Sequence, residues 1–164
     1  MNKEDVETLF AYNAWANERI MQAAARVSAE QFATPAHLSH GSLRTTLVHM
    51  LGAENVWRQR TQLGLSPTTL LKEPDFPTFE VLRQYVIDED QKWIDYAAEV
   101  TDAELQHVVH YKNTRGEPFS TPLWQIMAHV VNHGTQTRSE AAIALTEYNC
   151  SPGDIDLIKF LREW

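Results

Sequence analysis

The stretch that decides the fold is residues 121–148, TPLWQIMAHVVNHGTQTRSEAAIALTEY. Thr121 followed by Pro122 is a typical helix start, because proline at the first helical position gives up an N–H that has no partner there. Beyond it, Leu123, Met127, Val130, Ala141 and Leu145 fall on one face of a helix, at spacings of three, four or eleven residues. This spacing predicts a long amphipathic helix that ends near Tyr148.

Three further segments show the same helical periodicity. The first ends near Val27, before a capping sequence that starts at Ser28. The second runs to about Leu63, and the third begins after Thr78. Four such helices must bury their apolar faces against one another. The sequence therefore predicts an all-α four-helix bundle in which residues 1–164 form a single domain.

The connections between these helices contain turn-forming residues. Glycines and prolines between positions 64 and 77 indicate a long crossover between the second and third helices. Residues 105–120 favour strands around a turn at 113–116, so we expect a small irregular hairpin before the fourth helix. Asp154, which follows a Pro-Gly pair, is expected to cap a last short helix that ends near Arg162.

Composition and charge exclude several classes of protein. Apolar residues make up 43% of the chain and charged residues 22%, which is typical of a globular protein. The net charge is −8, from 14 Lys and Arg against 22 Asp and Glu, so no nucleic-acid partner is expected. No apolar run is long enough to span a membrane, and the acidic N-terminus is unlike a signal peptide. A single cysteine, Cys150, suits the reducing cytosol, so we expect a cytoplasmic protein.

Three of the seven histidines lie on the predicted long helices. His129 and His133 are four residues apart and share one face of the fourth helix, and His49 lies on the second. If these helices are neighbours, three imidazoles meet and suit a divalent ion such as zinc, with a position left open for water or substrate. Such a pair also occurs by chance, and a single histidine is more often a hydrogen-bonded core residue. The spacing alone leaves both interpretations open.

Five short motifs occur in a characteristic order: YNAWANER (12–19), GSL (41–43), TLVH (46–49), HVVNHGT (129–135) and SPGDIDL (151–157). Together they resemble the DinB family of DinB/YfiT-like metalloenzymes, over essentially the whole chain. The resemblance implies an up-down-down-up bundle, often a homodimer, with a divalent ion (Zn or Ni) held by one histidine of the second helix and two of the fourth. Family members of known activity are transferases and isomerases that use low-molecular-weight thiols.

Carried onto this chain, the resemblance assigns the metal ligands to His49 and His133, but Thr137 stands at the third family position. Three alternatives follow. The ion uses His129, one turn away, together with His49 and His133; or Thr137 or water fills the position with weaker binding; or the metal is absent. A hydroxyl is a poor ligand for a borderline-soft ion, and losing one imidazole of three costs affinity.

Two pairs of polar residues interrupt the apolar faces of predicted helices. Glu89 and Asp90 lie on the third helix, and we expect a local rotation that leaves both in solvent, because carboxylates are rarely buried unpaired. The alternative is that one of them orients a histidine N–H. Asn13 and Asn17 lie on the inner side of the first helix, where we expect them to bond to neighbouring backbone rather than to line a pocket.

Other candidates for a role at the metal site lie close to the histidines in sequence. Glu140 is one turn from Thr137, and we expect it to form a surface ion pair with Arg138 or Arg44 rather than to act as a base. The histidines outside the long helices, His40 among them, are expected to be exposed loop residues.

Two functions are compatible with this sequence. In the first, the chain is a divalent-metal-dependent enzyme. The ion lowers the pKa of a bound water or small thiol, which then attacks an electrophilic metabolite or xenobiotic as the small-molecule substrate. In the second, the chain is a metal-depleted, non-catalytic bundle that binds a small ligand or a partner. Thr137 favours the second, whereas the retention of His49, His129 and His133 favours the first.

Overall fold

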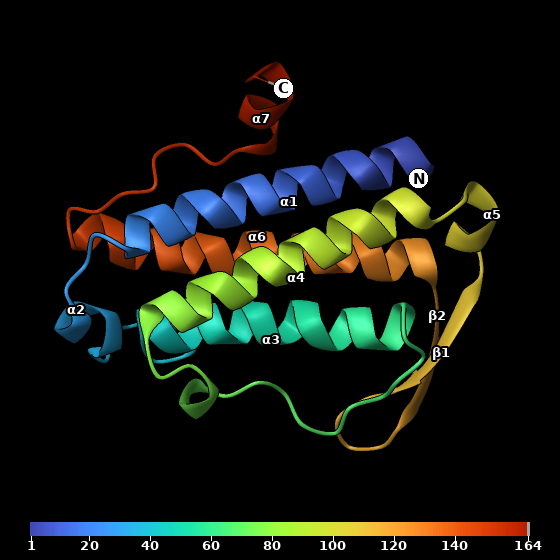
Figure 1. Cartoon of the computed structure of the whole chain (residues 1–164), viewed down its shortest axis with the longest axis horizontal. Coiled ribbons are helices and arrows are strands. Elements are labelled where there is room, and N and C mark those ends of the chain that lie inside the picture. Colours follow the sequence, from blue (N-terminus) through green and yellow to red (C-terminus); the bar gives the residue numbers. More distant parts are fainter. Residues whose placement is uncertain (164) are drawn as a thin grey trace.

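Four long helices dominate the computed structural model, which describes residues 1–163 (Figure 1). They are α1 (Lys3–Ala24), α3 (Leu43–Thr61), α4 (Phe79–Glu99) and α6 (Leu123–Glu147). The shorter elements are α2 (Ala29–Ala33), the 3-10 helix η1 (Glu73–Asp75), α5 (Asp102–Leu105), β1 (Val108–Lys112), β2 (Pro118–Pro122) and α7 (Leu157–Glu163). The predicted all-α four-helix bundle is confirmed.

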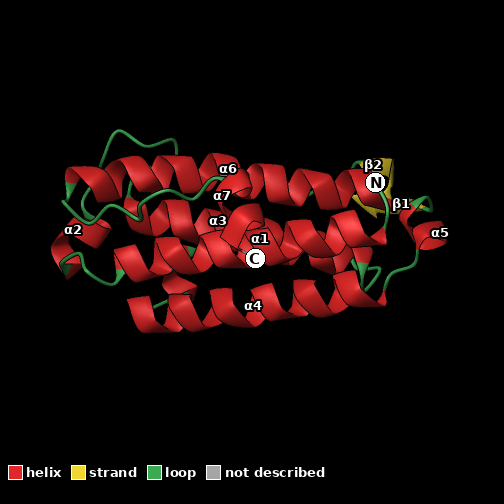
Figure 2. Ribbon diagram, turned by 90° about the horizontal axis from the view of Figure 1, so that it is seen from above, coloured by secondary structure: helices red, strands yellow, loops and turns green. Residues whose placement is uncertain are grey.

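The helices follow the up-down-down-up order. In Figure 1, α1 and α6 run in one direction, and α3 and α4 run in the other. The long crossover over residues 62–78 makes this possible, because it returns the chain to the end of the bundle where α3 begins. Both α1 and α3 pack against α4 and α6, so α1 and α3 are diagonal partners. Figure 2 accordingly shows α4 and α6 on opposite sides of the bundle.

The helix ends follow the predicted capping signals, with two shifts. The first helix ends at Ala24 rather than near Val27, and Ser28 caps the separate short helix α2. Pro122 precedes α6 instead of occupying its first position, because it is still paired with Val108 at the end of the hairpin. The N-cap predicted at the third helix is confirmed: Thr78 accepts a hydrogen bond from the N–H of Val81.

The predicted hairpin is present, and it covers one end of the bundle. Strands β1 and β2 pair antiparallel around a turn in which Gly116 has a φ of +84°, a value that favours glycine. The hairpin packs against α3 and α6. At the C-terminal end of the chain, Asp154 accepts a hydrogen bond from the N–H of Asp156, so it shapes the turn before α7 instead of capping that helix.

The apolar core consists of two clusters, with buried polar residues between them. One cluster holds the C-terminal part of α1 and the N-terminal parts of α3 and α4, and the other holds the opposite parts of α1 and α4. The polar side chains come from the middle of all four long helices. We call them the polar layer: Asn13, Asn17, Glu54, Asp90 and Arg138. Within residues 1–163, none of the helices combines the length and the apolar character that crossing a membrane requires.

Candidate functional site

Side-chain hydrogen bonds connect the polar layer across the bundle. Asn13 Nδ2 donates to Glu54 Oε1 at 2.8 Å, and Asn17 Nδ2 donates to Asp90 Oδ1 at 2.8 Å. Arg138 Nη1 donates to Oδ1 of Asn13 at 2.6 Å and to Oδ1 of Asn17 at 2.8 Å. Each asparagine therefore accepts from the guanidinium and donates to a carboxylate. The layer ties α1, α3, α4 and α6 to one another at mid-height of the bundle.

Burial changes the protonation of the two carboxyl groups in the polar layer. It raises the pKa of Asp90 well above its usual value, and the neighbouring charge of Glu54 raises that pKa further. Burial also raises the pKa of Glu54, but the hydrogen bond from Asn13 and the charge of Arg138 oppose the rise. The single guanidinium therefore favours charge on Glu54, while Asp90 favours its protonated form.

The expectation that Glu89 and Asp90 are solvated is wrong. Their side chains are buried, with 2% and 8% of each residue exposed. Glu89 receives two hydrogen bonds from Arg58 on α3, from Nε to Oε1 at 2.6 Å and from Nη2 to Oε2 at 3.0 Å. Asp90 receives its bond from Asn17, so this asparagine bonds to side chains and not to neighbouring backbone as expected. Hydrogen bonds from residues on other helices compensate the cost of burying these carboxyl groups. The sequence around Glu89 and Asp90 does not reveal those partners.

The expected surface ion pair of Glu140 is also wrong. Arg138 points into the bundle, and Arg44 forms its bonds near η1. Glu140 instead accepts hydrogen bonds from Ser39, from the backbone N–H at 3.1 Å and from the hydroxyl at 2.7 Å. These bonds anchor the loop before α3 to α6. The residue after Ser39 is His40, so Glu140 holds this histidine near the candidate metal ligands.

Four histidines form a cluster between α3 and α6; we call His40, His49, His129 and His133 the histidine cluster. The Nε2 atoms of His49 and His133 lie 3.1 Å apart. The His40 ring stacks on the His49 ring, with centroids 3.8 Å apart and planes inclined by 21°. His40 is exposed, as expected for a loop residue, but no sequence signal indicated this contact.

The third predicted ligand lies farther from the pair. The ring centroids of His129 and His133 are 6.0 Å apart, compared with 5.0 Å between His49 and His133. The His129 ring packs edge-on against Trp57, at a centroid distance of 5.3 Å. The structure thus brings His49 and His133 into direct contact, with His129 one helical turn away beside a tryptophan.

The three helical imidazoles are held in their neutral form. Burial, together with the smaller effects of His49 and His129, lowers the pKa of His133 to about 4. Burial also lowers the pKa of His49, followed by the effect of His40, and burial alone lowers that of His129. Neutral imidazole is the form that binds metal ions, so no proton has to be displaced at pH 7.

The contact between His49 and His133 suits two kinds of interaction. An Nε2 separation of 3.1 Å fits an N–H···N hydrogen bond. It is also close to the roughly 3.3 Å that separates two nitrogens bound to one tetrahedral zinc ion, each about 2.0–2.1 Å from it. Among residues 1–163, however, no three His, Cys, Asp or Glu side chains form a group that would hold a metal ion. The donor set therefore fits a two-ligand site, one imidazole short of what the resemblance implies.

Two further contacts bear on that site. Thr137, at the third family position, is buried and donates its hydroxyl to the backbone oxygen of His133 at 2.9 Å. His133 Nδ1 is buried without a hydrogen-bond partner. A histidine that binds metal usually gives this second N–H to a carboxylate or carbonyl. The surroundings of His133 thus lack the support that a tight metal site normally has.

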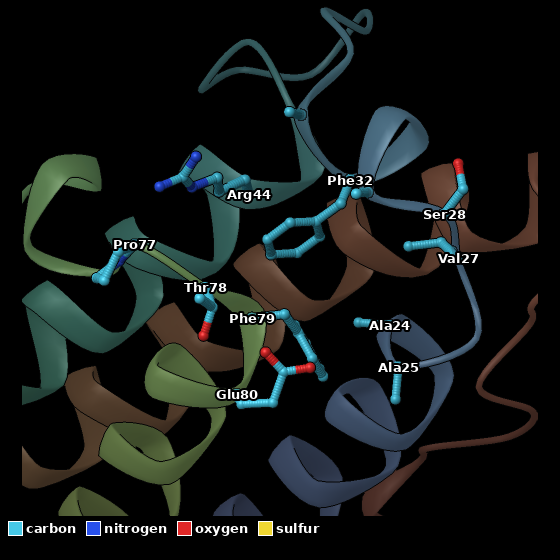
Figure 3. A pocket seen from close by; sticks show the side chains of 12 residues that line it. Ala24, Ala25, Val27, Ser28, Phe32, Arg44, Pro77, Thr78, Phe79 and Glu80 are labelled. Atoms are coloured by element: carbon cyan, nitrogen blue, oxygen red, sulfur yellow. The ribbon is translucent and has the colours of Figure 1, made fainter.

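Two clefts in the described part of the chain lie away from the histidine cluster. One of about 370 Å³ lies where α1 ends and α4 begins, and Phe32 and Phe79 meet there at a centroid distance of 5.4 Å (Figure 3). The other, of about 400 Å³, lies between α1, α6 and the start of α7, and Tyr12 and Asn132 are among its lining residues. Neither cleft is lined by a histidine.

Comparison with known proteins agrees with this architecture. The sequence profile of the DinB family matches residues 1–163, essentially the whole chain. Among curated proteins, none matches it. The chain that matches this family folds as an up-down-down-up bundle. In this bundle a histidine of α3 faces a histidine of α6. The chain therefore belongs to the DinB family.

Proposed function

We propose that this chain is a metal-dependent DinB-family enzyme whose divalent ion, zinc or nickel, is held by His49 and His133. The observation that carries the proposal is the 3.1 Å separation of their Nε2 atoms across the α3–α6 interface. Both imidazoles are neutral at pH 7, which suits them as ligands. The hydrogen bonds of Glu140 hold the loop that stacks His40 on His49, which restricts the orientation of one ligand ring.

We assign the third position to His129 rather than to Thr137. An imidazole is a better ligand than a hydroxyl for a borderline-soft ion, and the Thr137 hydroxyl already donates to the backbone of its own helix. His129 lies on the same face of α6 as His133. A rotation of its side chain away from Trp57 would bring its ring toward the ion. His129 therefore completes or supports the site.

A divalent ion bound between these histidines would act as a Lewis acid. It would lower the pKa of a bound water or thiol toward neutrality. The residues of this chain hold the site on two rigid helices and leave at least one position open. Following the family resemblance, we propose a low-molecular-weight thiol as co-substrate and a small electrophilic metabolite or xenobiotic as its acceptor.

The test is the metal content and metal affinity of protein purified without an affinity tag. We expect wild type to retain one ion per chain, His49→Ala and His133→Ala to lose it, and His129→Ala to bind at least tenfold more weakly. His110→Ala is the matched control, because His110 lies on the exposed hairpin and, of the residues that the structure describes, its ring bonds only to Ser120. It is expected to bind metal as wild type does.

The second candidate function is a metal-depleted bundle that binds a small ligand without catalysis. The observation that favours it is the pair of imidazoles without a third ligand in contact. The same experiment separates the two functions through Thr137→His, which restores the family ligand. If only Thr137→His acquires an ion and wild type binds none, the metal-dependent proposal is rejected and the second function replaces it.

A further inference from the structure

Arg60, in the last turn of α3, is buried without a polar partner among residues 1–163. Only 6% of the residue is exposed. Its guanidinium carbon lies 4.7 Å from the ring centroid of Trp57 and 5.3 Å from that of Tyr111 on β1. Its Nε is buried without a hydrogen-bond partner, and nothing among residues 1–163 forms a hydrogen bond or an ion pair with this side chain. We call Trp57, Arg60 and Tyr111 the arginine–aromatic cluster.

The other buried arginines show what Arg60 lacks. Arg58 makes a two-point ion pair with Glu89, and Arg138 bonds to two asparagines of the polar layer. A buried guanidinium without such partners loses its hydration and recovers only part of the loss from aromatic rings. Stacking against Trp57 and Tyr111 therefore positions the guanidinium but leaves its donors free.

The electrostatic surroundings of Arg60 agree with this contrast. Burial lowers the pKa of its guanidinium, and only the phenol of Tyr111 opposes the change. For the pKa of Arg138, by comparison, the carboxylate of Glu54 and then the phenol of Tyr12 oppose the same effect. A guanidinium remains charged at neutral pH in either case, so the arginine–aromatic cluster is a local positive charge in a chain whose net charge is −8.

We propose that the arginine–aromatic cluster binds the oxyanion of a small molecule, a carboxylate or a phosphate, through the guanidinium of Arg60. The guanidinium fork matches both anions with two parallel hydrogen bonds, and the flanking rings fix its plane. Trp57 also contacts His129, whose ring centroid is 6.0 Å from that of His133. The anion thus lies at the hairpin end of the histidine cluster. The inference rests on Arg60 and does not require a metal ion.

The experiment titrates full-length protein, freed of metal on a chelating resin, with inorganic phosphate and separately with butyrate at constant ionic strength in chloride-free buffer. We expect isothermal calorimetry to show saturable binding of at least one probe, with a dissociation constant in the millimolar range. Comparing the two titrations shows whether the site prefers phosphate or a carboxylate. Arg60→Met keeps the side-chain length but removes the charge, and it should bind at least tenfold more weakly. Arg19→Met is the matched control, because Arg19 also stacks on a tryptophan, at 4.4 Å, but has an ion pair with Glu163.

A second measurement uses wild-type protein, so it does not depend on whether a variant folds. The Nε–H resonance of Arg60 in wild-type protein should shift and saturate along the same titration, because the buried N–H exchanges slowly with water. Arg60→Lys keeps the charge without the fork and should bind severalfold more weakly than wild type. The proposal is overturned if neither probe shifts the resonance, if Arg60→Met binds as wild type does, or if Arg19→Met loses binding equally.

Discussion

The polar layer and the histidine cluster both place polar side chains between helices of the same bundle, but they meet their hydrogen-bonding needs differently. In the polar layer, one arginine, two asparagines and two carboxyl groups bond to one another across four helices, and only Glu54 Oε2 and Arg138 Nε of the layer are buried without a partner among the described residues. In the histidine cluster, the one hydrogen bond that joins His49 and His133 to other side chains of residues 1–163 is the bond between their own rings, and His133 Nδ1 has no partner there. We infer that the layer specifies the fold through its many bonds between helices, and, in line with the proposed function, that the cluster leaves ring nitrogens for a ligand.

The largest expected effect is on the polar layer, through Arg138→Met. The substitution removes the only guanidinium of the layer and leaves the Glu54 carboxylate buried without a compensating charge. We expect the free energy of unfolding to fall by about 3–5 kcal/mol, measured by denaturant titration followed by circular dichroism. Adding Glu54→Gln should recover part of the loss, since it removes the isolated charge. A loss below about 1 kcal/mol would show that the layer does not specify the fold.

Gly134→Ala tests how tightly the polar layer is packed. A Cβ at this position would lie 2.8 Å from both Arg138 Nη1 and Asn13 Oδ1. The strain should destabilise the protein by about 1–3 kcal/mol, despite the gain in helix propensity. Gly52→Ala is the control, because its Cβ would meet Leu71 at 3.7 Å or more. Thermal unfolding should show Gly52→Ala equal to or more stable than wild type; equal destabilisation of both would contradict the prediction.

Asp90→Asn tests the protonation of the polar layer through its dependence on pH. The pKa of Asp90 is higher in the folded than in the unfolded chain, so the folded chain binds more protons and this residue's contribution to stability falls as pH rises through the folded pKa. Asparagine keeps an oxygen acceptor for Asn17 without the charge. We expect Asp90→Asn to be more stable than wild type at pH 8, on the order of 1 kcal/mol, and the difference to vanish near pH 4. Unfolding free energies at pH 4, 6 and 8 check this.

The control for the pH experiment is Asp95→Asn, on the exposed side of the same helix. Its effect on stability should be small, because the side chain is exposed. If Asp90→Asn were less stable than wild type at pH 8, the ionised carboxylate of Asp90 would be a stabilising member of the layer instead.

The smallest expected effect on stability is that of His133→Ala in the histidine cluster. Within the described part of the chain, its ring bonds to no side chain except His49, so we expect the free energy of unfolding to change by less than about 1 kcal/mol. Affinity for zinc should nevertheless fall at least tenfold. Measuring unfolding and metal binding on the same preparation separates the two. A loss of stability as large as that of Arg138→Met would remove the distinction between the two regions.

The sequence predicted the helices, the crossover and the hairpin, because their signals are local. Thr78 caps α4, as its place before the apolar pattern predicts. The turn that contains Gly116 closes the hairpin, as expected. The errors concern side chains whose partners come from other helices. Glu89 was expected in solvent because nothing near it in sequence shows that Arg58 will face it. The same holds for Glu140, whose partner Ser39 lies 101 positions away in the loop between α2 and α3.

By itself, the amino-acid sequence determined the secondary structure, the bundle and the histidine face of α6, because the periodicity of apolar residues and the capping residues act within a few positions. Only the tertiary structure decided which buried charges have partners, that His49 meets His133 but not His129, and that none of the other described residues is a polar partner of Arg60. Contacts of this kind join residues dozens of positions apart, and they depend on how each helix is rotated about its axis. Packing of the whole core sets that rotation.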